Sequence, residues 1–344
     1  MSTRQFSNTS VKAGKQFIEL AIQLARASAW ATLAAMPLVA AAQDKAADYP
    51  NRTVRMVVPF PAGQATDINA RLIAERLSKR WGETVYVDNR GGGNGIPGMM
   101  AGRQAAADGY TITFGSSSTT SVNEALYPNL PYSTRDFVPV AAVFSQPWLI
   151  VTSPDAPYAN LKDVVDAAKK SPGQLNWGFG AVALELAGEL LKQQAEIDIR
   201  PINYKGSAAT VNDLAGGHIQ LGIETMAATL PHIKSGRIKA IAILSDRRSP
   251  LLPEVPTVAE QGFPGFVALG WAGLFVPNGT PADVVDKIAA AVRQVLSEPE
   301  VQEAIAKQGS VAETKSRSEW ESFVSSETAK WTQAIKKGNI KAPE

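Results

Sequence analysis

The stretch "TVRMVVPFPAGQATDINARLIAERLSKRW", from Thr53 to Trp81, decides the fold. It begins with an apolar, β-branched run that ends at Phe60 and is typical of a buried strand. Apolar residues then recur at helical spacing as far as Trp81, and Thr66 or Asp67 can cap that helix. A strand that leads directly into a helix is the repeating unit of an α/β fold.

The same unit is repeated downstream. A second strand, "TVYVDN", ends at Asn89, a short helix is expected near Met99 to Ala107, and a third strand covers Tyr110 to Ser116. Strands that alternate with helices predict a mostly parallel sheet flanked by helices. The common strand order 2-1-3 would place the first strand in the middle, with the winding reversal between the first and third strands.

A second α/β unit follows along the chain. It has five expected strands, at 149–154, 175–180, 199–204, 219–224 and 238–244, with helices at 161–170, 184–194, 207–214 and near Leu230. After a Pro-rich segment come one more strand, 269–277, and helices at 281–296 and 317–336. The chain therefore contains two sets of α/β elements and not one continuous series.

Two apolar segments, Val138 to Val151 and Phe266 to Pro277, are the places where we expect the chain to cross between the two units. Two crossings return the C-terminus to the first unit. The sequence thus predicts a two-lobed clamp with a two-strand hinge, residues 49–147 and 271–344 forming the first lobe and 148–270 the second. A length of 344 residues also makes a single core improbable.

The pattern of the first 42 residues predicts a secretory signal peptide. A basic leader precedes the apolar run Ala27 to Val39, and small residues follow at Ala40 to Ala42. This run is too short to cross a bilayer of about 30 Å. The chain has no cysteine, so we expect no disulfide, no thiol site and no lipid anchor, and a soluble protein in the periplasm.

Charge and residue types exclude several function classes. The leader holds four of the 34 basic residues and one of the 32 acidic residues, so the remaining chain is close to neutral and gives no sign of a nucleic-acid or membrane partner. The two histidines, His218 and His232, have no metal-ligand spacing. Asp67 and Glu224 could approach each other as an acid–base pair, but a helix cap or a contact to a ligand amino group explains Asp67 more simply. We expect no enzyme, metal or cofactor.

A glycine loop, "RGGGNGIPG" from Arg90 to Gly98, contains the pattern G-x-G-x-x-G. A dinucleotide fingerprint follows the first strand and is succeeded by an acidic residue about 20 positions later. This loop follows the second strand, and the next strand ends in "SSSTTS". We interpret it as a turn that leads into a helix, away from the winding reversal. A nicotinamide-dinucleotide-dependent enzyme that uses Gly93 to Gly98 is the alternative.

Two other loops flank the expected reversal, "PFPAGQATD" from Pro59 to Asp67 and "GSSSTTS" from Gly115 to Ser121. They offer backbone N–H groups, hydroxyl donors and helix N-termini, which together suit a carboxylate. An ordinary polar loop with a helix cap explains the serine row equally well. The ligand of an open α/β sheet lies at such a reversal.

At these loops the chain resembles the substrate-binding proteins of tripartite tricarboxylate transporters, the Bug receptors. The resemblance begins at Tyr49 and rests on blocks that include "YPNRTVRMVVPFPAGQATDINARLIAERLS", "VDNRGGGNGIPG", "DGYTITFGSSST", "YKGSAATVNDLAGGHIQLG" and "RSPLLPEVPTVAEQGFPGF". It implies a two-lobed periplasmic binding protein, monomeric, that binds a small carboxylate after the first and third strands. Its partners would be membrane permease subunits or a sensor kinase.

The resemblance also implies the ligand-binding residues. Those that match the family's motifs are Phe60, Gly63, Thr66, Asp67, Ser116, Ser117, Ser118, Thr119, Tyr204, Lys205 and Ser207. The first-lobe residues would donate to one carboxylate, and the second-lobe residues would make contacts on closure.

Two departures from the family concern the second lobe. Glu185, within "NWGFGAVALELAGE", stands where relatives usually have His, and Glu224-Thr225 stands where they usually have Asp-Asn. We include Glu224 and Thr225 in the predicted site. Trp177 and Phe179, with Trp148 nearby, either form an apolar slot for the ligand or simply pack in the core. The slot would favour a ligand with one carboxylate end and an apolar or aromatic body over citrate.

Overall fold

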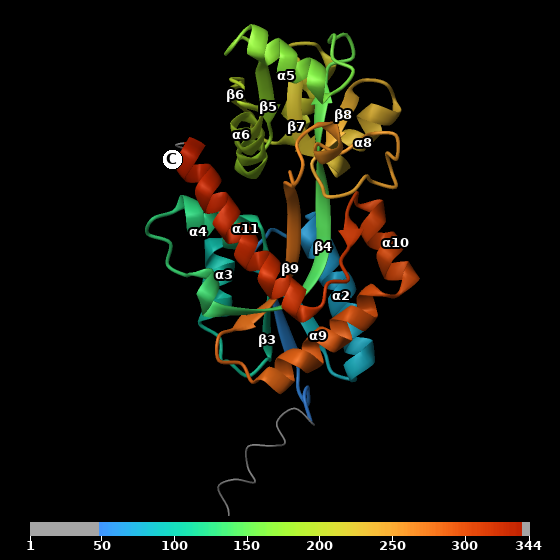
Figure 1. The fold of residues 1–344 in the computed structure, drawn as a ribbon. Helices are drawn as coiled ribbons and strands as arrows, with labels where there is room; N and C mark the ends of the chain where they lie inside the picture. Colours follow the sequence, from blue (N-terminus) through green and yellow to red (C-terminus); the bar gives the residue numbers. More distant parts are fainter. Residues whose placement is uncertain (1–47, 339–344) are drawn as a thin grey trace, which may run out of the picture. The chain divides into compact units, whose positions relative to one another are not determined.

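A computed structural model describes residues 48–338 of the chain (Figure 1). The predicted signal peptide lies outside the described residues. Residues 50–338 of the described chain form one compact unit. Within the described range, none of the helices combines the length and the apolar character that crossing a membrane would require.

The first sheet begins with three parallel strands: β1 (Val54–Val58), β2 (Val85–Asn89) and β3 (Thr111–Ser116). β1 pairs with both others, so the predicted order 2-1-3 is confirmed. Helices α2 (Ala65–Trp81) and α3 (Ile96–Arg103) connect these strands.

The cap of α2 differs from the prediction. Its N-cap is Gln64, and neither Thr66 nor Asp67 occupies that position. Asp67 lies in the first turn, where its carboxylate accepts the backbone N–H of Gly63 at 2.8 Å.

Two long strands connect the lobes, as the apolar segments predict. β4 (Phe137–Thr152) pairs with β9 (Leu269–Pro277) as far as Pro147, and from Trp148 it pairs with β7 (Leu221–Thr225). All the pairs of β4 and β9 are antiparallel, because the chain leaves through one and returns through the other (Figure 1). Each sheet is therefore mixed: the outer strands pair in parallel, as expected, and the strands that cross between the lobes are antiparallel to their neighbours. The lobe limits at 147/148 and 270/271 stay a prediction.

The second sheet continues from β4 through β7, β5 (Asn176–Phe179) and β6 (Arg200–Asn203), and β8 (Lys239–Ile243) also pairs with β4. Its helices are α5 (Leu161–Lys170), α6 (Val182–Ala195), α7 (Ser207–Ala215) and α8 (Met226–Lys234). A Cβ at Gly178 would lie 2.8 Å from the Thr210 methyl carbon, so glycine in β5 permits close packing of α7 on the sheet.

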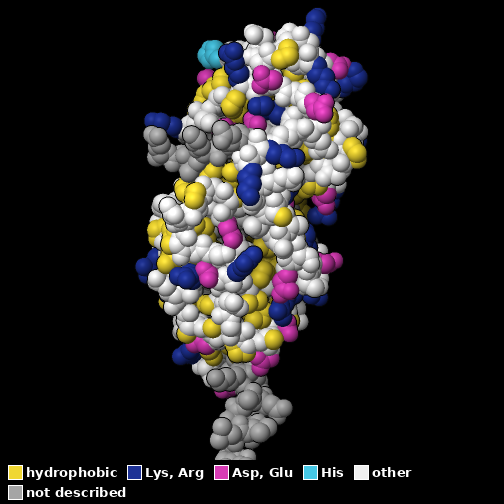
Figure 2. Space-filling view, turned by 60° about the vertical axis from the view of Figure 1, so that its left-hand side comes forward, with side chains coloured by type: hydrophobic (Ala, Val, Ile, Leu, Met, Phe, Trp, Pro, Cys, Tyr) yellow, Lys and Arg dark blue, Asp and Glu magenta, His cyan; other side chains and the backbone are white. Residues whose placement is uncertain are grey.

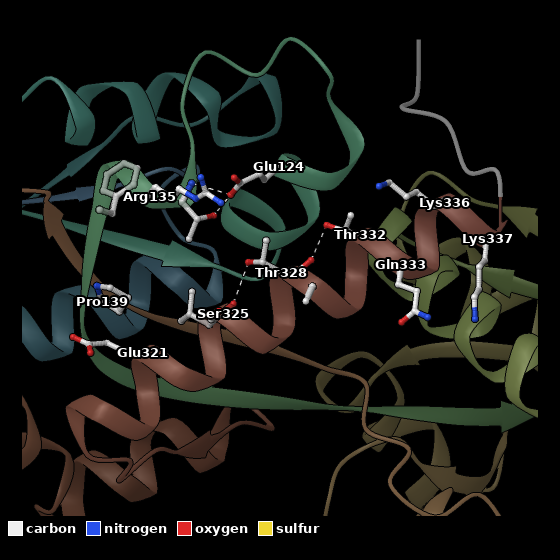
Figure 3. A pocket seen from close by; sticks show the side chains of 14 residues that line it. Glu124, Arg135, Pro139, Glu321, Ser325, Thr328, Thr332, Gln333, Lys336 and Lys337 are labelled. Carbon is white, nitrogen blue, oxygen red and sulfur yellow. Dashed lines mark hydrogen bonds between the residues drawn. The ribbon is translucent and has the colours of Figure 1, made fainter.

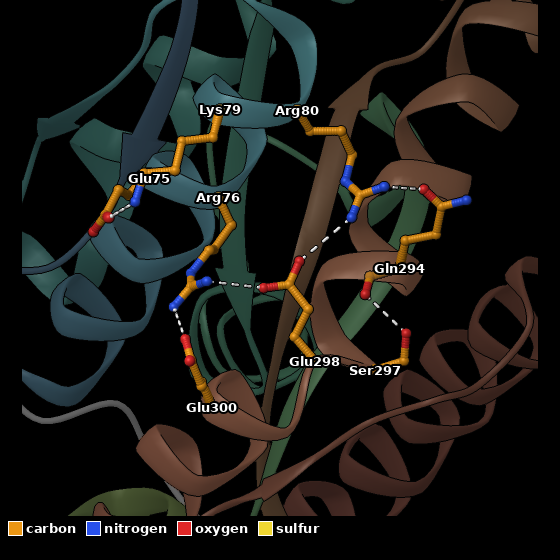
Figure 4. A network of polar contacts seen from close by, with 8 residues as sticks. All are labelled: Glu75, Arg76, Lys79, Arg80, Gln294, Ser297, Glu298 and Glu300. Carbon is orange, nitrogen blue, oxygen red and sulfur yellow. Dashed lines mark hydrogen bonds and ion pairs between the residues drawn. The ribbon is translucent and has the colours of Figure 1, made fainter.

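The C-terminal segment returns to the first lobe. It comprises α9 (Ala282–Leu296), α10 (Pro299–Lys307), β10 (Val311–Ala312) and α11 (Arg317–Gly338). Arg76 of α2 contacts Glu298 at 3.1 Å and Glu300 at 2.7 Å, and Arg80 contacts Glu298 at 3.4 Å (Figure 4). These ion pairs attach the returning segment to helix α2 of the first lobe. The sequence did not predict α10.

Short elements complete the described chain: 3₁₀ turns at Gly93–Gly95, Thr134–Asp136 and Ala259–Gln261, a π-turn at Ser118–Val122, and helix α4 (Asn123–Leu126).

Helix α11 packs where the two sheets meet. Glu327 accepts the indole N–H groups of Trp271 in β9 and Trp331 in α11, both at 3.0 Å. Trp331 in turn packs against Trp148, with ring centroids 6.4 Å apart. One apolar cluster thus joins α11 to the start of the second sheet.

Candidate functional site

A cleft of about 720 Å³ lies at the carboxyl ends of the parallel strands. Its first wall comes from the loops after β1, β2 and β3, and its second wall from the loops after β5 and β6. Loops in this position form the usual ligand site of α/β sheets. The lining residues are Pro59, Phe60, Pro61, Gln64, Gly92, Asn94, Gly95, Ser118, Val122, Asn123, Leu126, Tyr127, Phe179, Gly180, Ala181, Val182, Ala183, Asn203, Tyr204, Lys205 and Gly206.

Four helices begin at this cleft. The N-cap residues of α2, α3, α6 and α7 are Gln64, Gly95, Ala181 and Gly206, and all four line the cleft. None of these N-caps provides a side-chain hydrogen bond to its helix. The helix dipoles favour negative charge at these N-termini, although the carboxylate of Glu224 already lies beside the start of α7.

The side chains of the cleft fit an anion with an apolar body. Lys205 is the only charged residue among those that line it. Phe60, Val122, Leu126 and Val182 contribute apolar surface between the two walls. The cleft offers donors to a carboxylate, and no Asp or Glu among its lining residues would repel one. Its apolar side chains suit an apolar ligand body.

The glycine loop forms part of the first wall, since Gly92, Asn94 and Gly95 line the cleft. The prediction that this loop lies away from the site is wrong. Its interpretation as a turn fits the backbone, with φ of 92° at Gly92, 54° at Asn94 and 78° at Gly95. A Cβ on Gly95 would lie 2.5 Å from the Thr119 methyl carbon, so this glycine lets the loop pack against the loop after β3.

Asp67 shapes the first loop and does not line the cleft. Its side chain, in a residue only 2% exposed, accepts hydrogen bonds from Gly63 and from the Asn89 amide, each at 2.8 Å, and forms an ion pair with Arg71 at 3.0 Å. Burial alone would raise the pKa of Asp67, but these partners outweigh it and hold the pKa below its ordinary value. Gly63 and Thr66 also lie outside the lining.

The hydroxyl row after β3 is mostly buried. The Ser116 N–H donates to the Thr119 hydroxyl at 2.9 Å, and the Thr120 hydroxyl donates to the Ser116 carbonyl at 2.6 Å. Only Ser118 of the four predicted residues Ser116, Ser117, Ser118 and Thr119 lines the cleft. Much of the row therefore stabilises its own turn, which is the alternative that the sequence left open.

In the second wall, Phe179, Tyr204 and Lys205 line the cleft, whereas Ser207 and Thr225 do not. Trp177 is fully buried and packs edge-on against Phe179, with ring centroids 5.6 Å apart. Trp148 is buried against Trp331. The structure supports core packing for both tryptophans, so the apolar slot loses two of its three aromatic residues.

Two carboxyl groups lie behind the second wall. Glu224, at the end of β7, is 0% exposed, and burial raises the pKa of its carboxyl. Glu185 in α6 accepts a hydrogen bond from the amide of the cleft residue Asn203 at 3.1 Å, and burial raises its pKa too. Because neither Asp67 nor Glu224 lines the cleft, they do not form an acid–base pair on its surface.

Several lining residues were not predicted: Gln64, Asn94, Asn123, Tyr127 and Asn203. Asn94 lies in the glycine loop and Asn203 directly before the Tyr-Lys-Gly-Ser turn, so both adjoin motifs that the sequence does single out. For Asn123 and Tyr127 we find no comparable signal in the sequence.

A second cavity, about 850 Å³, lies along α11 and is lined by residues that include Arg135, Pro139, Ser325, Thr328 and Lys336 (Figure 3). It contains none of the predicted site residues. It borders the side of a helix and not the ends of parallel strands, so we place the candidate site in the cleft.

Other kinds of site find little support in residues 48–338. This range contains no cluster of His, Asp or Glu side chains suited to a metal ion. On the face shown in Figure 2, basic and acidic side chains are interspersed, with no large area of one sign.

Comparison with known proteins gives consistent matches. The family model described as tripartite tricarboxylate transporter family receptor matches residues 69–340. Protein BugT of Bordetella pertussis is 36% identical over 305 residues, which are 88% of this chain and 94% of that protein. A protein from the tcbD-tcbE intergenic region of Pseudomonas sp. (strain P51) is 36% identical over 292 residues, 83% of this chain and 86% of that protein.

Solved structures give the same result. The periplasmic binding protein BugD is 33% identical, with a TM-score of 0.66, over 85% of this chain and 99% of that one. An R. palustris protein solved with adipate is 32% identical, with a TM-score of 0.70, over 86% of this chain and 99% of that one. A Rhodopseudomonas palustris protein solved with malate is 30% identical, with a TM-score of 0.66, over 83% of this chain and 100% of that one.

Proposed function

The chain belongs to the tripartite tricarboxylate transporter family of receptors, and on this basis we propose that it captures a small organic acid by a carboxylate in the cleft. The family match confirms the resemblance found in the sequence, the two-lobed periplasmic-binding-protein fold and the expectation of a receptor rather than an enzyme. The nicotinamide-dependent alternative is therefore wrong.

The observation that carries the proposal is the convergence of four helix N-termini, without side-chain caps, on a cleft whose only charged lining residue is Lys205. In this proposal one carboxylate lies against the first wall, where Gln64, Asn94 and Ser118 supply polar side chains beside the starts of α2 and α3. The rest of the ligand packs on Phe60 and Leu126. An aromatic body fits this surface as well as an aliphatic one, since the aromatic residues Phe60 and Tyr127 line it.

Binding would couple to closure of the two lobes. The two walls belong to different sheets, and β4 and β9 are the strands that connect them. A ligand that touches both walls adds contacts that only the closed form makes, so it shifts the population toward closure. The closed monomer would then deliver its ligand to membrane permease subunits, or present it to a sensor kinase.

A thermal-shift panel tests the ligand class. It comprises benzoate, hexanoate, terephthalate, adipate, citrate and glutamate, with NAD as a control for the excluded cofactor class. At least one mono- or dicarboxylate should raise the melting temperature, because a ligand that binds only the folded state stabilises it. If citrate alone stabilises the protein, the ligand does not have an apolar body. If none of the acids does, the proposal of a carboxylate ligand is wrong.

Variants locate the site. Lys205→Ala and Ser118→Ala should each weaken the best ligand about three- to tenfold in calorimetry. Ser118 is a donor at the first wall, and Lys205 is the only positive charge among the residues that line the cleft. Thr332→Ala, in the cavity along α11, is the control and should leave affinity unchanged. Equal losses of ligand affinity in all three variants would contradict the assignment of the ligand site to the cleft.

A further inference from the structure

A buried glutamate lies directly behind the second wall. Glu224 is the penultimate residue of β7. This strand lies next to β5, whose last residue Phe179 is followed by the cleft residue Gly180. A Cβ on Gly180 would lie 2.7 Å from Glu224 Oε1 and 2.4 Å from the backbone N of Ser207, the first residue of α7. The carboxylate therefore sits beside the Gly180 backbone at the start of α7.

Glu224 has no cation to balance its charge. None of the ion pairs among the described residues includes it, and neither of its carboxylate oxygens has a hydrogen bond of normal geometry. Its polar neighbours are the hydroxyls of Ser207 and Thr210 and the N–H groups of Gly180 and Thr225. The start of α7 also lies beside the carboxylate and favours a negative charge there.

The two walls of the cleft differ in charge for this reason. On the first wall the nearby carboxylate, Asp67, is paired with Arg71. On the second wall Glu224 lies at the helix end that would otherwise favour a ligand anion beside Lys205 and Gly206, and Glu185 behind Asn203 adds a second carboxyl. Glu224 and Glu185 therefore offset the attraction that Lys205 and the start of α7 would otherwise exert on an anion at the second wall.

We infer that Glu224 determines charge selectivity at the second wall: the receptor prefers an acid with one carboxylate, held by the first wall, and disfavours a second carboxylate at the far end. This inference rests on the proposed function and makes it more specific. Glu224 acts through the electrostatic field and the α7 terminus and not by touching the ligand, since its side chain is buried.

The test compares acids that share a carbon skeleton and differ in one carboxylate, hexanoate with adipate and benzoate with terephthalate, by calorimetry at pH 7.5. In the wild type the monocarboxylate of the better-bound pair should bind about tenfold more tightly, the scale of one like-charge contact across a partly solvated wall. Glu224→Gln keeps the size and removes the charge. It should tighten the dicarboxylate about tenfold and change the monocarboxylate less than about twofold.

Glu313→Gln is the matched control, because Glu313 is a buried glutamate beside Lys315 and does not line the cleft. It should leave the ratio of the two affinities unchanged. Tighter binding of the dicarboxylate by the wild type overturns the inference and leaves the receptor function intact. If a folded Glu224→Gln variant has the same ratio of dicarboxylate to monocarboxylate affinity as the wild type, the inference is also overturned and the receptor function stays intact. Failure of all four acids to bind overturns the proposed function itself. The ratio of the monocarboxylate and dicarboxylate affinities is measured on the wild type alone, so this part of the test remains valid even if Glu224→Gln does not fold.

Discussion

At the scale of single residues, Asp67 supports the site from behind it. Asp67→Ala leaves the N–H of Gly63 and the amide of Asn89 without their acceptor and Arg71 without its ion pair. We expect the free energy of unfolding to fall by about 1–3 kcal/mol, measured by urea denaturation. Asp166→Ala removes an exposed carboxylate paired with Lys162 and should cost less than about 0.5 kcal/mol. Equal losses in both variants would contradict a supporting role for Asp67.

We expect the buried carboxyl of Glu224 to make the stability of the protein depend on pH. Its pKa is raised above the ordinary 4.5 in the folded protein, so the unfolded chain releases the proton at lower pH. The folded state therefore loses stability as the pH rises from about 4.5 through the higher folded pKa, after which the loss is constant. Glu224→Gln lacks this loss. Melting temperatures between pH 4 and 8 should show a difference between variant and wild type that grows in favour of the variant as the pH rises above about 4.5. A difference independent of pH would show that Glu224 does not titrate in this range.

At the scale of elements, the glycine loop makes a prediction about contacts. Gly95→Ala should destabilise the protein by about 2–3 kcal/mol and weaken ligand binding, because the residue has φ of 78° and its Cβ would lie 2.5 Å from Thr119. Gly236→Ala is the control: its φ is 73°, but a Cβ there meets nothing within 4 Å. It should cost only about 1 kcal/mol, the backbone part alone. Denaturation and calorimetry measure both effects, and equal costs would show that the contact with Thr119 is unimportant.

The elements themselves were largely predictable, whereas their contacts were not. The alternation of apolar runs and helical spacing correctly gave β1 to β3 and their order. It could not show that the loop after β2, at the sheet edge, reaches the cleft, because this depends on glycines that let it pack over Pro59 and Thr119. Likewise, the side chains of Trp177 and Phe179 lie on the same face of β5 and both are buried in the core, and the sequence pattern alone could not distinguish this from a position in the cleft.

At the scale of the whole molecule, hinge segments were predictable because a long apolar run must be buried, but strand direction was not. The apolar sequence of β4 is compatible with parallel and with antiparallel neighbours. The return of the chain through β9 decides that these two strands are antiparallel. The return itself depends on contacts between residues far apart in sequence, such as Arg76 with Glu298 and Glu327 with Trp271. A local pattern contains no information on such pairs.

This arrangement makes closure observable. Trp331 of α11 packs against Trp148 where β4 passes from one sheet to the other, and its indole N–H donates to Glu327. Rotation of the lobes about β4 and β9 should change these surroundings, so a bound acid should alter tryptophan fluorescence in proportion to site occupancy. Trp331→Phe should remove most of this change, whereas Trp81→Phe, at the end of α2, should preserve it.

Calorimetry on the same variants separates closure from binding. If the acid binds Trp331→Phe with near wild-type affinity while the fluorescence change is lost, the signal reports movement at the hinge. If Trp81→Phe loses the signal instead, the change arises in the first lobe, and closure about β4 and β9 is not what the ligand drives. A bound ligand that changes no tryptophan emission in the wild type would also contradict closure at this hinge, because the contact between Trp148 and Trp331 lies where β4 passes from one sheet to the other.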